Sequence, residues 1–328
     1  MERYDLSAAH VTEGLPEGAT KRQGVSLAIG FFDGMHLGHR EVVRQAVAAA
    51  RRRGLVPAAM TFSQHPRVVL GHGSHYETVL TPLEDKLALL AEIGVEATYV
   101  IRFDKAFSEV TAEQFVKSIL VPLGAKSTTV GFDFAFGHRG AGNAEKIREY
   151  GEGAIDVEVV SPVFLDGDKV SSTRIRERLQ AGDCHEASRL LGRCYAIAGT
   201  VVHGDARGRQ LGFPTANLSP EQPYVIPRSG VYAIRIDVPG ESGASEGSYE
   251  GVLNVGLRPT FDAPGGALKL EAHLFDFTGD LYGRRLSLSF HAYLREEKKF
   301  ESVGQLVEQI SSDASEARRL FALASRPS

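Results

Sequence analysis

The pattern of apolar and polar positions differs between the two halves of the chain. In the first half, short apolar runs alternate with segments of helical period. Strands are predicted at Val25–Phe31, Val56–Phe62, Ala97–Phe103, Ser127–Phe132 and Ile155–Val160. Helices are predicted at Arg40–Arg53, from the capping box Thr81–Glu84 to about Ile93, and after the capping box Thr111–Gln114. Strands that alternate with helices predict a parallel sheet covered on both faces.

Beyond about residue 185 the pattern changes to an alternation with a period of two residues. Strands are predicted at Tyr195–His203, Val231–Val238, Leu268–Leu274 and Leu286–Phe290, with glycine and proline turns between them. This pattern predicts an antiparallel β domain that is closed or nearly closed. Two helices are expected afterwards, at Ser302–Ile310 and Asp313–Ala324, and Pro239–Ser248 is interpreted as a flexible surface loop.

The chain has 328 residues, enough for two domains, which we place at 1–184 and 185–328. Its 37 basic and 41 acidic residues give a net charge of −4, which argues against a general nucleic-acid binder. No apolar run reaches the length of a membrane span, and the N-terminus lacks the apolar core of a signal peptide. With two cysteines, interpreted as packing residues, a cytoplasmic protein is expected. A monomer and a homo-oligomer both remain open.

A glycine-rich turn with two histidines follows the first predicted strand, in the run AIGFFDGMHLGHR. Ligands bind at the carboxyl ends of such strands, and the N-terminus of the next helix suits phosphate. His36 and His39 share the first helical turn, where two imidazoles can donate hydrogen bonds to phosphate oxygens. The same pair could bind zinc, but no third ligand lies at a fitting spacing. A phosphate site is therefore favoured.

This run resembles the signature of the HxGH nucleotidyltransferase superfamily, in its flavin-adenylylating branch. The resemblance implies that the phosphate of FMN attacks the α-phosphate of ATP and that pyrophosphate leaves, with no covalent enzyme intermediate. It also implies that His36 and His39 stabilise the transferring phosphate. The implied ATP-binding residues are Gly30, Phe32, Asp33, Gly34, His36 and His39.

Two further segments of the first half carry the same resemblance. The run SSTRIR at 171–176 resembles the superfamily's phosphate-binding motif, although its hydroxyls alone would only predict a helix N-cap. It implies that Ser172, Thr173 and Arg176 hold pyrophosphate. The run VGFDFAFG resembles the flavin-side motif, which implies that Asp133 faces FMN or its metal. The sequence departs from the family at three positions, where arginine and Asp-Pro are usual: Ala135, Ser63 and Gln64.

A second phosphate signal is the run GDARGRQLGFPTAN, which ends at Asn217. It lacks the G-K-[ST] of a Walker loop. On an extended chain Thr215 and Asn217 point the same way and offer two neutral oxygen ligands, which suits Mg²⁺. Glu271 lies opposite the apolar face of its strand, either as a solvated carboxylate or as a general base for a substrate hydroxyl.

The second half resembles the riboflavin kinase family in the runs GRQLGFPTANL, GVYAIRI, NVGLRPTF, LEAHLFDFTGDLYGRRL and LREEKKFES. The resemblance implies that Glu271 is the base, that Thr215 and Asn217 hold Mg²⁺, and that Arg295 and Glu297–Phe300 close over flavin. The implied ATP-binding residues are Gly208, Gly212, Thr215 and Asn217. Cys194 and Leu257 stand where proline and threonine are usual.

Taken over residues 20–310, the motifs resemble the bacterial bifunctional riboflavin kinase/FAD synthetase family. The expected fold is a Rossmann-like HxGH-type domain followed by an antiparallel β-barrel kinase domain with C-terminal helices. The expected substrates and products are ATP, riboflavin, FMN and FAD, with Mg²⁺ as cofactor and no nucleic-acid or membrane partner. Three alternatives stay open: a first domain without activity, a different acceptor for the adenylyl group, and a flavin carrier without turnover.

Overall fold

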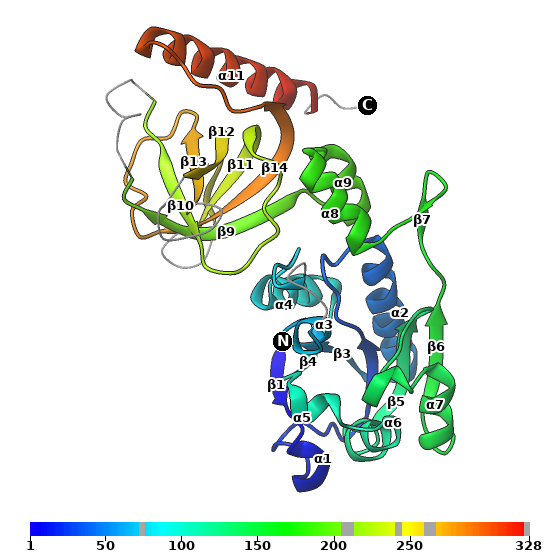
Figure 1. Cartoon of the computed structure of the whole chain (residues 1–328). Helices are drawn as coiled ribbons and strands as arrows, with labels where there is room; N and C mark the ends of the chain where they lie inside the picture. The colour runs from blue at the N-terminus through cyan, green and yellow to red at the C-terminus, as the bar shows by residue number, and fades with distance from the viewer. Residues whose placement is uncertain (72–75, 205–212, 240–244, 259–266, 325–328) are drawn as a thin grey trace. The chain divides into compact units, whose positions relative to one another are not determined.

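The computed structural model describes residues 1–71, 76–204, 213–239, 245–258 and 267–324, and the following statements concern these residues. The chain divides into two compact units, Met1–Ser172 and Thr173–Ser328 (Figure 1). This division falls earlier than the domain boundary expected at 184/185. The helices α8 (Ser172–Ala181) and α9 (Cys184–Leu191) therefore lie almost wholly in the second unit.

The first unit contains a six-stranded parallel sheet, which confirms the predicted fold class. The strand order is β1-β4-β3-β2-β5-β6, and every neighbouring pair is parallel. The bounds are β1 Glu2–Leu6, β2 Val25–Ile29, β3 Val56–Phe62, β4 Ala97–Ile101, β5 Ala125–Gly131 and β6 Asp156–Val160. Strand β1 was not predicted, because only Leu6 of its residues is buried and the segment lacks an apolar run.

Helices cover both faces of this sheet, as expected from the alternation of strands and helices. On one face, α2 (Leu37–Arg53) and α4 (Leu83–Ile93) pack on Ala28, Ala59 and Val100. On the other, the π-helical segment η2 (Phe115–Leu120) and α7 (Ala144–Tyr150) belong to a core with alternate strand residues such as Leu27 and Met60. The remaining short elements are α1 His10–Glu13, α3 Pro66–Val69, α5 Lys105–Ser108, α6 Ala112–Gln114, η3 His138–Gly140, β7 Phe164–Leu165 and β8 Asp168–Lys169.

The two predicted capping boxes have different outcomes. At Thr111 both reciprocal hydrogen bonds with Gln114 form, so this prediction is confirmed. Helix α4, in contrast, has Pro82 as its N-cap, without a side-chain hydrogen bond at that position. The prediction that Thr81 is the N-cap is wrong. The backbone N–H of Thr81 instead donates to the carboxylate of Asp33.

The second unit contains a closed antiparallel barrel, as the period-two pattern predicts. The strand order is β10-β13-β12-β11-β14-β9. The bounds are β9 Tyr195–Val202, β10 Ala216–Pro220, β11 Gly230–Pro239, β12 Ser245–Arg258, β13 Ala267–Leu274 and β14 Arg285–Arg295. Helix α11 (Val303–Ala324) lies beside the barrel (Figure 1). Its Ala317 and Phe321 belong to one apolar cluster with Val231 and Ala233 of β11.

Two predictions for this unit are corrected. The two expected C-terminal helices are one helix, α11, and Ser311 stays in it because its hydroxyl donates to the carbonyl of Val307. The expected loop Pro239–Ser248 is partly strand, because Gly247 and Ser248 pair with Val238 and Asp237 in a β12–β11 ladder. Residues 240–244 of that loop lie outside the described residues.

Candidate active sites

The predicted phosphate turn connects β2 to α2 and has a strained backbone. Phe32 and Met35 have positive φ angles of 56° and 44°, a conformation that non-glycine residues rarely adopt. Both side chains are buried in the core beneath α2, which compensates for the strain. A Cβ on Gly30 would lie 2.7 Å from the ring of Phe32, so this position requires glycine. The turn thus combines a position that requires glycine with two buried apolar side chains that anchor it.

The two predicted histidines lie against each other at the start of α2. His36 is the N-cap, and its Nδ1 accepts the backbone N–H of His39 at 3.3 Å. The two rings stack with centroids 3.6 Å apart and planes 17° apart. Burial, the neighbouring His36 and the cation of Lys86 together hold the pKa of His39 well below its usual value. A neutral ring at His39 keeps one N–H donor for a phosphate oxygen.

Asp33 joins the turn to two other segments of the first unit. Its buried carboxylate accepts the backbone N–H groups of Leu80, at 2.8 Å, and Thr81, at 3.3 Å. The hydroxyl of Ser172 donates to the carbonyl of Asp33 at 2.8 Å. The structure therefore brings Ser172 to the histidine turn, as expected if both bind one nucleotide. Thr173 and Arg176 follow on α8 in the second unit, and their role stays a prediction.

Lys86 is a site residue that the sequence reasoning missed. It is 2% exposed and lies under the turn. Its Nζ donates to the carbonyl of Phe31 at 2.7 Å and to the hydroxyl of Thr61 at 3.3 Å, and it lies 4.2 Å from the ring centroid of Phe31. Burial lowers its pKa to about 8, although Asp33 opposes that shift. The signal was a lysine within the apolar stripe of a predicted helix, next to Leu87 and Leu90.

The predicted flavin-side residue Asp133 lies just beyond β5 on the surface. Its carboxylate is 3.5 Å from the Nζ of Lys169, which also lies 4.2 Å from the ring centroid of Phe132. Phe132 is 46% exposed. The structure thus presents an aromatic ring, a cation and a carboxylate together on the surface of the first unit. Three positions that depart from the family pattern are also exposed: Ser63, Gln64 and Ala135.

In the barrel, three polar residues form a row across neighbouring strands. Glu271 of β13 pairs with Asn217 of β10 on one side and with Asn254 of β12 on the other. Directly paired residues place their side chains on the same face of a sheet. Two ionic or polar contacts extend the row: Lys269 Nζ lies 2.9 Å from Glu271 Oε1, and Asn254 Nδ2 donates to Glu297 at 3.0 Å. The carboxylate expected on the solvent side of β13 is found there.

Two cavities adjoin this row. One, of about 330 Å³, is lined by Thr215, Glu271 and Arg295 together with apolar residues such as Val252 and Phe300. The other, of about 650 Å³, is lined by Gly204 and Asn217. Lys269 lines both. Of the predicted kinase residues, Gly208 and Gly212 lie outside the described residues.

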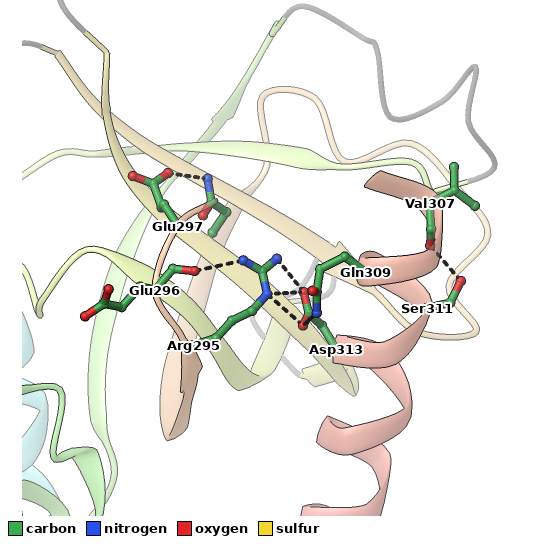
Figure 2. Close-up of polar contacts among 8 residues, drawn as sticks. Arg295, Glu296, Glu297, Val307, Gln309, Ser311 and Asp313 are labelled. Atoms are coloured by element: carbon green, nitrogen blue, oxygen red, sulfur yellow. Dashed lines mark hydrogen bonds and ion pairs between the residues drawn. The ribbon is translucent and has the colours of Figure 1, made fainter. Parts of the chain in front are cut away.

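Arg295, expected to bind flavin, is held by the C-terminal helix (Figure 2). Its Nε and Nη2 donate to the buried carboxylate of Asp313 at 2.9 and 2.7 Å, and its Nη1 donates to the carbonyl of Glu296 at 2.8 Å. Gln309 also donates to Asp313, at 2.9 Å. Sequence reasoning missed Asp313, because a carboxylate on an amphipathic helix ordinarily faces water. Through it, α11 positions the arginine at the rim of the smaller cavity.

Comparisons with known proteins assign a family to each half of the chain. A family model described as FAD synthetase matches residues 19–174, and one described as riboflavin kinase matches residues 191–321. A bifunctional riboflavin kinase/FMN adenylyltransferase from Listeria monocytogenes is 40% identical over 296 residues, covering 90% of this chain and 92% of the relative. A protein of the same description from Escherichia coli K12 is 38% identical, covering 92% and 94%.

Among solved structures, a crystal structure described as a macrolide-efflux protein from Streptococcus pneumoniae matches with a TM-score of 0.83. It is 32% identical, and the match covers 96% of this chain and 98% of that protein. The structural likeness therefore extends over nearly the whole of both chains. In the described part of the present chain, no helix is long and apolar enough to cross a membrane.

Proposed function

The chain belongs to the bifunctional riboflavin kinase/FMN adenylyltransferase family, and we propose how its residues divide the two reactions. The C-terminal half transfers the γ-phosphoryl group of ATP to riboflavin and gives FMN. The N-terminal half transfers the adenylyl group of a second ATP to FMN, which gives FAD and pyrophosphate. The two reactions need different chemistry, because only the first must remove a proton from a hydroxyl group.

For the kinase reaction, the smaller cavity holds riboflavin and the larger one holds ATP. Apolar residues line the smaller cavity, which suits the flavin ring, and Arg295 lies at its rim. Glu271 takes the proton from the 5′-hydroxyl of riboflavin, since its carboxylate lines that cavity and is the strand partner of Asn217. The observation that carries this assignment is the position of the Asn254–Glu271–Asn217 row beside both cavities.

Thr215 and Asn217 are the residues that would hold Mg²⁺ with ATP. The donor set fits: a hydroxyl and an amide oxygen beside a carboxylate suit a cation that keeps several waters and binds phosphates. A Cβ on Gly204 would lie 2.1 Å from the side-chain amide of Asn217, so glycine there leaves the amide its place. Bound Mg²⁺ would neutralise charge on the phosphates as the phosphoryl group moves.

For the adenylyl transfer, the nucleophile is the phosphate of FMN, which is already an anion at neutral pH. The site therefore needs donors and positive charge rather than a base. His36 and His39 face the α-phosphate of ATP from the N-terminus of α2, and Gly30, Phe32, Asp33 and Gly34 shape the turn around the nucleotide. Ser172, Thr173 and Arg176 hold the leaving pyrophosphate, and Asp133 faces the flavin side.

Separation of flavins by chromatography tests both activities. The purified protein is incubated with riboflavin and MgATP, and samples are taken over time. The proposal predicts that FMN forms first and FAD follows. FMN without FAD would overturn the adenylyltransferase assignment. Bound flavin without any product would favour a carrier.

The protein acts on small molecules, and we propose that it does so in the cytoplasm, without nucleic acid or membrane. We also propose that FMN leaves the kinase site and rebinds at the adenylyltransferase site. The motif sets for the two reactions lie on different halves of the sequence, which favours release. A measurement of the molecular mass in solution would distinguish a monomer from a homo-oligomer.

A further inference from the structure

Lys86 is a buried cation whose contacts are with neutral oxygens. Among the described residues, its ammonium donates to the carbonyl of Phe31 and to the hydroxyl of Thr61, and neither partner is a carboxylate. Burying a charged group without an ionic partner is costly, so such lysines are rare in positions that only fill a core. Perturbed cations next to a functional site are candidates for a role in it.

The hydrogen bonds of Lys86 converge on one peptide of the phosphate turn. The hydroxyl of Thr61 donates to the carbonyl of Phe31 at 3.0 Å, and Lys86 donates to the same carbonyl at 2.7 Å. This carbonyl follows Gly30, where the turn leaves the sheet. Helix α4, through Lys86, and strand β3, through Thr61, thereby both bind the first peptide of the turn. The ring of Phe31 also lies over the ammonium, so both main chain and side chain of this residue are fixed.

We propose that Lys86 is a positioning residue for adenylyl transfer, which sets the phosphate turn through the Phe31 carbonyl and adds positive charge beneath the bound triphosphate. The inference rests on the proposed role of the turn in binding ATP. Its two hydrogen bonds go to the turn and to Thr61, so we assign Lys86 a positioning role rather than contact with the reacting atoms. It acts through the turn backbone and through His39, whose pKa its charge helps to lower.

The protonation of Lys86 gives the proposal a second, independent readout. Burial lowers the pKa of Lys86 to about 8, so the lysine loses its charge just above neutral pH. Among the described residues, the titratable groups that interact electrostatically with it are Asp33 in the turn and His39 on α2, while Thr61 on β3 carries no charge. The ratio kcat/KM reports the free enzyme, so it should fall as Lys86 is deprotonated.

Variants of Lys86 test the positioning role, with thermal unfolding of the first unit as the control of folding and riboflavin phosphorylation as a reaction of the other unit. Lys86→Met keeps the length of the side chain without its charge and should lower kcat/KM for ATP in FAD formation by about 10- to 100-fold. Lys86→Arg should retain most of that activity. Lys117→Met is the matched control, because Lys117 is exposed and paired with Glu113 in the same unit. Riboflavin phosphorylation should be unchanged in all three.

The pH profile separates positioning from a purely structural role. In the wild type, kcat/KM for ATP in FAD formation should fall above pH 8, and Lys86→Arg should remove this fall because arginine stays protonated. FAD formation by Lys86→Met at the wild-type rate would overturn the inference. An identical alkaline fall in Lys86→Arg would also overturn it, even if Lys86→Met does not fold. A wild type that makes FMN but no FAD would instead contradict the proposed function.

Discussion

The two candidate sites present their charged groups in opposite ways. In the first unit, Lys86 and Asp33 are buried, and each is fixed by contacts with backbone or hydroxyl groups. In the barrel, the side chains of Lys269 and Glu271 are 33% and 23% exposed and form an ion pair on the outer face of the strands. The two acceptors are thus expected in different surroundings: FMN beside a buried, desolvated turn in one unit, and riboflavin beside an accessible carboxylate in the other.

The difference follows the chemistry of the two acceptors. The phosphate of FMN attacks as an anion, so its site gains most from fixed donors that do not reorganise. The hydroxyl of riboflavin must lose a proton, so its site needs a carboxylate that a substrate can reach. We therefore propose that a charge in the first unit acts through the backbone it holds, whereas Glu271 acts directly on riboflavin.

The largest effect is expected at Glu271. Glu271→Gln keeps the shape of the side chain and removes the base, so kcat for riboflavin phosphorylation should fall by about 10²- to 10⁴-fold. FAD formation from added FMN should be unchanged, because it takes place at the other site. Initial rates with riboflavin and with FMN, measured on the same preparation, check both statements. If Glu271→Gln phosphorylates riboflavin at the wild-type rate, Glu271 is not the general base.

The next effect is expected at His39. His39→Ala removes the ring that we propose as a donor to the transferring phosphate, so kcat for FAD formation should fall by about 10²- to 10³-fold. Riboflavin phosphorylation serves as the internal control and should keep its rate. His10→Ala is a matched control, since His10 lies on the short helix α1, away from the phosphate turn. Equal losses in both reactions would point to misfolding and would not support the assigned role.

A third effect concerns the Asp313–Arg295 contact. Asp313→Ala leaves a largely buried guanidinium without its carboxylate, which should lower the free energy of unfolding by about 3 kcal/mol. It should also raise KM for riboflavin, because Arg295 loses its fixed place at the cavity rim. Thermal unfolding followed by circular dichroism and the kinase KM measure the two effects. Glu316→Ala breaks the exposed pair with Arg319 and is the matched control, which should change the unfolding midpoint far less than Asp313→Ala.

The smallest effect is expected at Lys269. Its ion pair with Glu271 is accessible to water, so Lys269→Met should lower kcat/KM for riboflavin by only about two- to fivefold. The effect should shrink as salt concentration increases, because salt screens exposed pairs. Kinase rates at two ionic strengths check this. A loss as large as that of Glu271→Gln would mean that Lys269 contacts the reacting phosphate.

Much of the fold could be predicted from the sequence because local patterns and tertiary structure agree in it. Strand β3 (Val56–Phe62) has the predicted bounds, and the period-two segment of β13 places Glu271 where expected. Strand β1 could not be predicted, because its place at the sheet edge comes from pairing with β4 rather than from its own residues. The split of the C-terminal helix was wrong because Ser311 and Ser312 look like a break, but the hydroxyl of Ser311 donates to the carbonyl of Val307 within the helix.

The site was predictable only where a motif carries it. His36, His39 and Ser172 come together as expected, since each belongs to a recognisable run. Lys86 and Asp313 could not be assigned, because each is one of several polar residues on an amphipathic helix, and its helix carries no motif that singles it out. Their roles depend on which oxygen or guanidinium the fold brings opposite them, and this is a property of packing between distant segments.

Complementation between two variants tests whether one chain holds two separate sites. Glu271→Gln and His39→Ala are each incubated with riboflavin and MgATP, alone and as an equimolar mixture. We expect almost no product from Glu271→Gln, FMN without FAD from His39→Ala, and FAD from the mixture. FAD made from riboflavin by either variant alone at the wild-type rate would contradict this expectation.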